Sequence, residues 1–227
     1  MIYHNNLIDN FRNTHDWGTN IWHNSSLMQG NYYSDYTGVD ANEDGIGDIP
    51  YNISGGSNQD LYPLMNSITY EDILQNIFDR GFPIRHAIDG NWAAAQSFIP
   101  TLDTLTKTEI YLRKFGTPEF NLTVELREDD PQGTLIDILV FTPEHTSSSW
   151  TWLPLDFTDT TVTPGTEYFI VCPPALSGVT TSFGYEWGYA LGNQYDEGSF
   201  WFTRDGGGLW RDLPTMYEFV FRTFGYL

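Results

Sequence analysis

The sequence has 227 residues, of which 40% are hydrophobic and 16% aromatic, enough for one large β domain or two smaller ones with packed cores. Thirty acidic and ten basic side chains give a net charge of -20, which repels phosphate backbones and argues against nucleic acid as a partner. No apolar run reaches membrane-spanning length and no signal peptide opens the chain, so we expect no membrane insertion.

The first segment, residues 1–66, is rich in Asn, Asp, Gly and Tyr and has almost no long apolar runs. Short alternating stretches such as IYHNNLIDN, followed by Asn-rich turns, are typical of a right-handed parallel β-helix, in which stacked Asn side chains hydrogen-bond along the coil. Only one or two coils fit here, so we expect a terminal cap of such a helix. The opening residues resemble the middle of a repeat, which suggests a truncated gene or a fragment.

An acidic loop, GVDANEDGIGDIPYN at residues 38–52, holds four acidic residues within nine positions. Its spacing matches D-x-N-x-D-G-x-G-D, a Ca²⁺ loop in which alternate side chains turn their oxygens inward and Gly45 permits a sharp turn. Hard oxygen donors favour Ca²⁺ over Zn²⁺ or Cu²⁺. The predicted ligands are Asp40, Asn42, Asp44, Asp48 and the backbone carbonyl of Ile46.

The end of this loop departs from an EF-hand. Tyr51 stands where a bidentate Glu would close the site, and Pro50 argues against a flanking helix. The closing carboxylate must come from elsewhere, with Asp60 in SNQDLYPLM as the first candidate and Asp35 as the second. The alternative is a solvated acidic turn that binds no ion.

Residues 30–65, GNYYSDYTGVDANEDGIGDIPYNISGGSNQDLYPLM, resemble the C-terminal closing segment of parallel-β-helix repeat proteins. That family includes periplasmic copper-site maturation proteins and surface proteins of methanogenic archaea, and IYHNNLIDN is similar to its repeat coil. The resemblance covers residues 1–66 and implies an extracytoplasmic setting, so we expect an extracellular or cell-surface protein. It does not imply copper binding, because His4, His15 and His23 form no His/Met/Cys cluster.

Residues 67–90 change character and are expected to be a linker. In TYEDILQNIFDRG the apolar residues recur at helical spacing and Gly81 stands where it would end a helix, so the spacing predicts a short helix. The apolar residues are Ile73, Leu74, Ile77 and Phe78.

Residues 91–227 contain eight or nine stretches of strand character, separated by turns such as TPGTEY and DGGG. NLTVELRE and MYEFVFRTF alternate apolar with polar residues, which is typical of antiparallel sheets with one wet face. We therefore predict an all-β fold whose second part, residues 91–227, is a jelly-roll-like β-sandwich. Glu218 and Arg222 are expected on the wet face. The predicted inward residues are Leu122, Val124, Leu126, Phe219 and Phe221.

This second part also resembles β-sandwich modules of archaeal and bacterial surface proteins that are similar to carbohydrate-binding modules. The stretches that carry this resemblance are AAQSFIP, LTVELRE, VTPGTEYFIV and FRTFGY. The resemblance is at the level of the fold.

The sequence favours sugar binding over catalysis. No G-x-S-x-G, H-E-x-x-H or Gly-rich phosphate loop is present, so we expect no catalytic residues. Residues 183–213 are dense in aromatic rings, which stack on the C–H faces of pyranoses while polar side chains bind the hydroxyls. The predicted ligand-binding residues are Trp187, Tyr189, Tyr195, Trp201, Trp210, Asp196, Arg204 and Asp205. The alternative is that these rings fill the core.

The sequence thus predicts a non-catalytic, Ca²⁺-binding surface module whose partner is a polysaccharide or surface glycan. Two other interpretations stay open. The chain would be a fragment of a polysaccharide-degrading β-helix enzyme if missing coils held the active site. It would be a structural protein if the sandwich only packed against other envelope proteins.

Overall fold

The protein is all-β in the part of the chain that this computed structural model describes, residues 1–85, 91–176 and 180–226. Within it the only helix is a single 3-10 turn, η1 (Pro143–His145). The chain divides into two compact units, Met1–Thr69 and Tyr70–Gly225. The predicted all-β class is confirmed.

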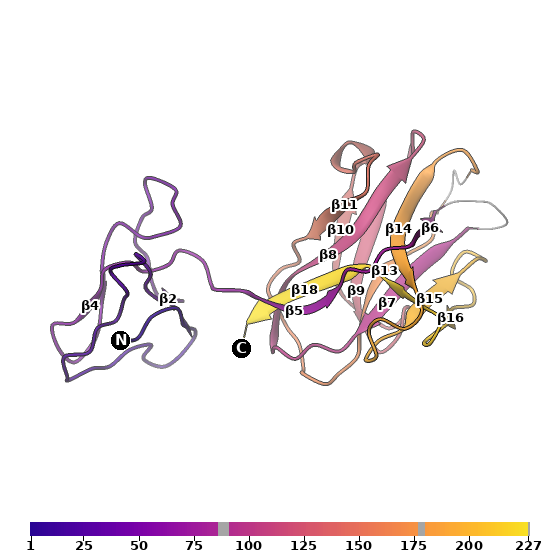
Figure 1. Ribbon diagram of the computed structural model, residues 1–227. Helices are drawn as coiled ribbons and strands as arrows, with labels where there is room; N and C mark the ends of the chain where they lie inside the picture. The colour runs from indigo at the N-terminus through magenta and orange to yellow at the C-terminus, as the bar shows by residue number, and fades with distance from the viewer. Residues whose placement is uncertain (86–90, 177–179, 227) are drawn as a thin grey trace. The chain divides into compact units, whose positions relative to one another are not determined.

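The first unit consists of very short strands joined by long turns (Figure 1). β1 (Asn6–Leu7) pairs in parallel with β2 (Tyr32–Tyr33). β3 (Tyr51–Asn52) pairs antiparallel with β4 (Gln59–Asp60).

Parallel pairing in this unit extends beyond β1 and β2. Tyr32 also forms a parallel bridge with Leu64, whose N–H donates to the Asn31 carbonyl at 2.9 Å. The side-chain amide of Asn5 donates to Asn31 Oδ1 at 2.8 Å, so these two Asn residues are linked between neighbouring segments. Three segments separated in sequence therefore run side by side in one direction.

The centre of the first unit contains a buried carboxylate. Asp60 accepts hydrogen bonds from the Asn31 N–H at 2.7 Å, the Tyr33 hydroxyl at 2.9 Å and the Tyr62 N–H at 3.0 Å. Burial and the nearby Asp60 charge raise the pKa of Tyr33. Asp60 thus has a structural role, because its oxygens satisfy polar groups that the fold has removed from water.

The second unit contains two large sheets. The first is antiparallel and six-stranded, in the order β10-β9-β13-β7-β15-β16. Its strands are β7 (Ala93–Phe98), β9 (Leu122–Glu128), β10 (Thr134–Phe141), β13 (Tyr168–Cys172), β15 (Phe200–Thr203) and β16 (Arg211–Asp212). The edge strand β10 carries a bulge between Leu135 and Asp137, where its register on β9 shifts.

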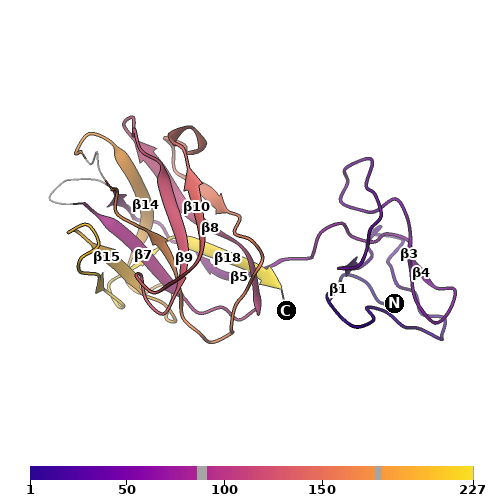
Figure 2. The same ribbon diagram turned by 180° about the vertical axis from the view of Figure 1, so that it is seen from behind.

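The second large sheet has eight strands arranged around β8, seen from behind in Figure 2. Its main path is β17-β14-β8-β18-β5, while β11 and β12 also pair with β8 and β6 pairs with β14. Its strands are β5 (Tyr70–Gln75), β6 (Arg80–Ile84), β8 (Thr104–Phe115), β11 (Thr151–Leu155), β12 (Thr160–Thr161), β14 (Gly184–Leu191), β17 (Tyr217–Phe219) and β18 (Phe221–Tyr226).

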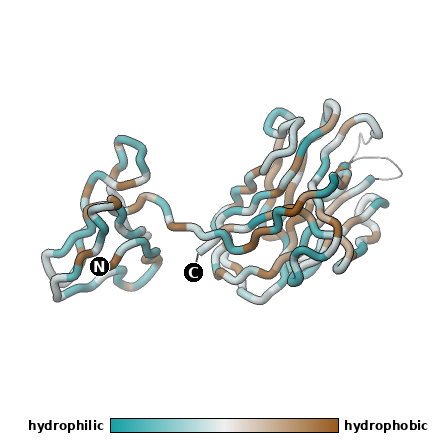
Figure 3. The backbone as a smooth tube through the Cα atoms, viewed as in Figure 1, coloured by the Kyte–Doolittle hydropathy of each residue, from teal (hydrophilic) through white to brown (hydrophobic). Residues whose placement is uncertain are grey.

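One hydrophobic core joins the two sheets, so the unit is β-sandwich-like. Val124 of β9, Ile110 of β8 and Phe219 of β17 belong to the same buried cluster. Hydrophilic and hydrophobic positions alternate along many of the strands (Figure 3). All five residues predicted to face inward are 0% exposed: Leu122, Val124, Leu126, Phe219 and Phe221. The alternation in NLTVELRE and MYEFVFRTF is therefore confirmed at these positions.

The helix predicted within residues 67–90 is wrong. Residues 70–75 form β5 on β18, and residues 80–84 form β6 on β14, both antiparallel. Ile73 is buried while its β5 neighbour Leu74 is exposed, because alternation along a strand separates residues that a helix would place on one face. The boundary between units precedes β5, so residues 70–85 of the expected linker belong to the second unit. Residues 86–90 lie outside the described part.

Glu218 also departs from the prediction made from the sequence. It was expected on the wet face, but it is 0% exposed. Its Oε2 accepts a hydrogen bond from Gln96 Nε2 of the opposite sheet at 2.6 Å, and Gln96 Oε1 accepts the Phe219 N–H at 2.8 Å. Glu218 thus contacts the six-stranded sheet, as the Phe219 ring does through Phe200. Burial raises the pKa of Glu218 to about 8.

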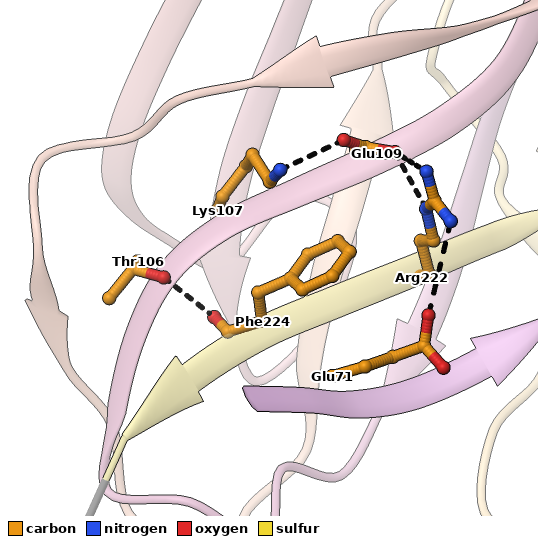
Figure 4. A network of polar contacts seen from close by, with 6 residues as sticks. All are labelled: Glu71, Thr106, Lys107, Glu109, Arg222 and Phe224. Atoms are coloured by element: carbon orange, nitrogen blue, oxygen red, sulfur yellow. Dashed lines mark hydrogen bonds and ion pairs between the residues drawn. The ribbon is translucent and has the colours of Figure 1, made fainter. Parts of the chain in front are cut away.

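A network of charged side chains crosses neighbouring strands of the eight-stranded sheet (Figure 4). Glu109 of β8 pairs with Lys107 at 3.0 Å and accepts a hydrogen bond from Arg222 Nε of β18 at 2.6 Å. Burial raises the pKa of Glu109, but hydrogen bonds from these two cations outweigh it, so the pKa is lowered. Arg222 lies 3.9 Å from Glu71 of β5, so a single ladder of charges links three strands. Arg222 faces the wet side as expected.

We expect Phe219→Ala to lower the free energy of unfolding by about 3–5 kcal/mol, because it removes a fully buried ring. The ring stacks on Trp187 at 4.3 Å and on Phe200 at 4.1 Å. Urea denaturation measures the change. Leu209→Ala, at an exposed loop position, is the control and should change stability by less than about 0.5 kcal/mol. A loss under about 1 kcal/mol for Phe219→Ala would contradict the assigned core.

Glu218 should make stability depend on pH. Its folded pKa of about 8 lies above the ordinary 4.5, so the folded state keeps a proton that the unfolded state loses. The contribution of Glu218 to the free energy of unfolding is therefore fully present below pH 4.5 and falls as pH rises toward 8. Glu218→Gln removes this titration, and its melting temperature should vary less across the same window. Equal slopes for parent and variant would assign the pH dependence to other groups.

Candidate ligand-binding face

The outer face of the six-stranded sheet brings distant parts of the chain together. The cross-strand register aligns one residue from each strand: Ile138, Glu125, Val171, Ala95, Trp201 and Asp212. Neighbouring strands lie about 4.8 Å apart, so the backbones at Glu125 and Trp201, three spacings apart, are separated by roughly 14 Å. This band points away from the core, because the alternate residue Val124 belongs to the inner cluster.

Two of the predicted aromatic residues, Trp201 and Trp210, lie on this outer face. Both are half-buried and pack against a small cluster of Ala95, Phe169 and Val171. Trp201 meets the Phe169 ring edge-on, with the ring centroids 5.9 Å apart and an interplanar angle of 77°. Each indole is therefore partly covered and partly accessible, and the covered part of Trp201 includes Nε1, which is buried without a hydrogen-bond partner among the described residues.

Trp210 lines a hollow of about 330 Å³ on the same face. The hollow also contains an ion pair from β9, in which Arg127 Nε donates to Glu125 at 2.7 Å. Arg127 Nη1 donates to the Gly133 carbonyl at 2.6 Å, which fixes the guanidinium against its own hairpin. The rest of the lining is Pro131, Gln132, Val171, Pro173, Pro174, Gly206 and Gly207. An aromatic ring, a donor and an acceptor thus border one hollow.

The DGGG turn that precedes Trp210 is fixed by Asp205. The Asp205 carboxylate accepts hydrogen bonds from the Thr203 hydroxyl at 2.6 Å and the Leu209 N–H at 3.0 Å, and the Thr203 bond is the main cause of its lowered pKa. Gly206 and Gly207 have φ values of +77° and +93°, which favour glycine. Asp205 therefore shapes the turn and does not line the hollow.

Three of the predicted ligand residues lie in the core or in loops, away from the outer face of the six-stranded sheet. Trp187 is buried in the core, where its indole N–H donates to the Val220 carbonyl at 2.9 Å. The Tyr195 hydroxyl accepts the Ile99 N–H at 3.0 Å, and burial raises the pKa of Tyr195 to about 12. Asp196 lies in an exposed turn. These residues support the loops and the core.

Tyr189 and Arg204 line a different pocket, between the sheets. The Arg204 guanidinium lies 4.4 Å from the centre of the Trp92 ring. Trp201 and Trp210 are thus the two predicted aromatic residues that share the outer face. Sequence reasoning did not name Glu125 and Arg127 as site residues, although their alternation with Leu126 already indicated an outward direction.

The acidic loop of the first unit forms a tight turn closed by its own carboxylates. Asp40 accepts the Gly45 N–H at 2.8 Å and the Asp44 N–H at 3.2 Å, and Asp48 accepts the Ala41 N–H at 2.8 Å. Gly45 has a φ of +83°, as the sharp turn requires. The predicted ligand residues are therefore close together along one loop.

The side chains of this loop have the chemistry of a hard-cation site, but they point at backbone N–H groups. Asp44 Oδ1 accepts the Ile46 N–H at 2.9 Å, and Asn42 Nδ2 donates to Asp44 Oδ2 at 2.9 Å. Within the described residues no group of three or more His, Cys, Asp or Glu side chains is arranged to hold a metal. Carboxylate and amide oxygens fit Ca²⁺ by type, and binding requires them to turn toward a common centre.

The two candidates for the closing ligand have other partners. Asp60 belongs to the buried network around Asn31 and Tyr33. Asp35 accepts hydrogen bonds from the Asn13 side chain at 2.7 Å and the Tyr51 hydroxyl at 3.0 Å. In this arrangement the oxygen ligands available to a cation are those of the loop's own residues.

No family model and no curated protein matches the chain. Over the described ranges, none of the helical structure has the length and hydrophobicity needed to cross a membrane. Function is therefore inferred from the outer face of the six-stranded sheet and from the acidic loop.

Proposed function

We propose that the second unit binds a polysaccharide or surface glycan on the outer face of its six-stranded sheet. The observation that supports this most is the placement of Trp201 and Trp210 on one face, beside the Glu125–Arg127 pair and the hollow of about 330 Å³. Half-buried indoles held by a sheet lose little freedom on binding, so their stacking on sugar C–H groups contributes to affinity.

The polar groups of the hollow suit hydroxyl-rich ligands. Glu125 supplies acceptors and Arg127 supplies donors, and the pair adds no net charge to the site. A chain with a net charge of -20 repels polyanions at low ionic strength, which favours neutral over acidic glycans. No catalytic step is part of the proposal.

The finer fold assignment is part of the same proposal. Two sheets packed over one core support a jelly-roll-like sandwich similar to carbohydrate-binding modules. The parallel pairing of β1 with β2, continued from Tyr32 to Leu64, supports a β-helix cap for the first unit. The Asn5–Asn31 bond matches the side-chain stacking of such coils. Both assignments favour an extracellular or cell-surface protein, of the kind found in archaeal envelopes.

We further propose that the acidic loop binds Ca²⁺. The ion would neutralise the crowded carboxylates and cross-link the turn, replacing the hydrogen bonds that now close it. The spacing of the oxygen donors and the turn at Gly45 support this. The residues that would hold the ion are Asp40, Asn42, Asp44, Asp48 and the carbonyl of Ile46.

Glycan binding should depend on the two outer indoles. We expect Trp201→Ala and Trp210→Ala each to weaken binding by about 2- to 12-fold, equivalent to about 0.5–1.5 kcal/mol per stacked ring. Calorimetric titration with neutral and acidic polysaccharides in 0.15 M salt measures this, with circular dichroism to verify folding.

Trp150→Ala is the matched control for these variants. Trp150 is also half-buried but stacks on Tyr111 of the eight-stranded sheet, with centroids 5.6 Å apart. Its loss should leave binding unchanged. An equal loss in all three variants, or no binding at millimolar glycan, would overturn the proposal and favour the structural role in envelope assembly.

Calcium should raise the melting temperature of the first unit. At a free Ca²⁺ concentration about a hundred times the dissociation constant, the ion adds about 2.7 kcal/mol of stability. Thermal melts with Ca²⁺ and with chelator measure this, and Asp44→Asn should reduce the shift. Asp129→Asn, an exposed acidic residue of the second unit, is the control. Identical melts with and without Ca²⁺ would contradict the site.

A further inference from the structure

A second pocket lies between the two sheets and is not used by the proposed glycan site. Its volume is about 290 Å³. One wall comes from β6 and β14 of the eight-stranded sheet, and the other comes from β15 of the six-stranded sheet. The aromatic residues that line it are Phe82, Trp92, Tyr189, Phe200, Phe202 and Tyr217.

The rings of this pocket pack against one another in tilted and edge-to-face contacts. Phe82 lies 5.2 Å from Trp92 and 5.1 Å from Phe200, the latter at an interplanar angle of 85°. Tyr189 and Tyr217 are perpendicular, with centroids 5.5 Å apart. Such packing positions the walls before any ligand arrives, so the ordering cost of binding is small.

Arg204 is the one charged side chain among the described residues that line the pocket. Its guanidinium stacks 4.4 Å from the centre of the Trp92 ring and 5.5 Å from that of Phe202. A guanidinium carries five N–H donors in one plane, so it can stack on a ring and still donate to an anion at its edge.

We propose that this pocket binds a small aromatic carboxylate. The ring enters between the aromatic walls, and the carboxylate accepts hydrogen bonds from Arg204. Apolar walls with one polar group at a fixed place are the usual composition of a small-molecule site, and a volume of about 290 Å³ suits a ligand with a single ring. Aromatic cages also bind organic cations, but the Arg204 charge disfavours a cation here.

A matched series of probes tests the ligand chemistry on the full chain. The probes are 3-phenylpropionate, its neutral amide 3-phenylpropionamide and the cation 3-phenylpropylamine, titrated in 0.15 M salt by calorimetry. We expect the carboxylate to bind about tenfold more tightly than the amide, as one charge-assisted hydrogen bond contributes, and the amine to bind weakest. Equal or tighter binding of the amine, or no carboxylate binding at millimolar concentration, would overturn the proposal.

Three variants locate the site. Leu213→Trp fills the pocket and should weaken carboxylate binding by more than tenfold, while Leu209→Trp places the same ring on an exposed loop outside it and should not. Arg204→Gln, at an exposed position, should bring the carboxylate and the amide to equal affinity. Unchanged carboxylate binding by a folded Leu213→Trp, or an unchanged preference in Arg204→Gln, would contradict the assignment.

Carboxylate binding in the pocket can be tested separately from glycan binding on the outer face. Trp201→Ala should lose glycan affinity but keep the affinity for 3-phenylpropionate, because Trp201 lies on the other face of β15 and does not line this pocket. Loss of carboxylate binding in Trp201→Ala would place the ligand on the outer face and overturn the proposal.

Discussion

The stack of Trp187, Phe219 and Phe200 is the interaction on which the second unit depends. Trp187 and Phe219 belong to the eight-stranded sheet and Phe200 to the six-stranded sheet, so the three parallel rings span the gap between the layers. The stack sets the direction of β15: because Phe200 faces inward, its neighbour Trp201 must face outward. The core thus determines which side chains β15 places on the outer face, and Phe200 of the same stack also lines the pocket of about 290 Å³ between the sheets.

A polar link reinforces this aromatic one. Gln96 of β7 bonds both Glu218 and the backbone of Phe219, while the Gln75 side chain of β5 donates to the Phe219 carbonyl at 3.1 Å. Buried amides accept few alternative positions, since a displaced partner leaves an unsatisfied group in a dry interior. The Gln96 amide therefore links the two sheets beside the aromatic stack, while Gln75 links β5 to β17 within the eight-stranded sheet.

Alternation along single strands could be predicted from the sequence, but the order of strands in the sheets could not. The period of two in NLTVELRE placed Leu126 inward and Glu125 outward, as the structure has them. Nothing in the sequence indicated that β9 lies in the same sheet as Trp201, so Glu125 was missed as a site residue. The segment around Ile73 looked helical because two apolar residues of β5, Ile73 and Leu74, and two of the connection that follows it, Ile77 and Phe78, happen to recur at helical intervals.

The bulge in β10 affects whether a strand of another molecule can add to this edge of the sheet. A straight edge strand with exposed Leu135, Ile138 and Val140 is a template on which a strand of another molecule can add, which is the first step of aggregation. The register shift before Asp137 interrupts that template, and the Asp137 carboxylate accepts the Thr158 N–H at 3.0 Å beside it. The irregularity therefore breaks the run of regular hydrogen-bonding groups along the edge, and deleting Ile136 would restore a straight, apolar edge on which another strand can add.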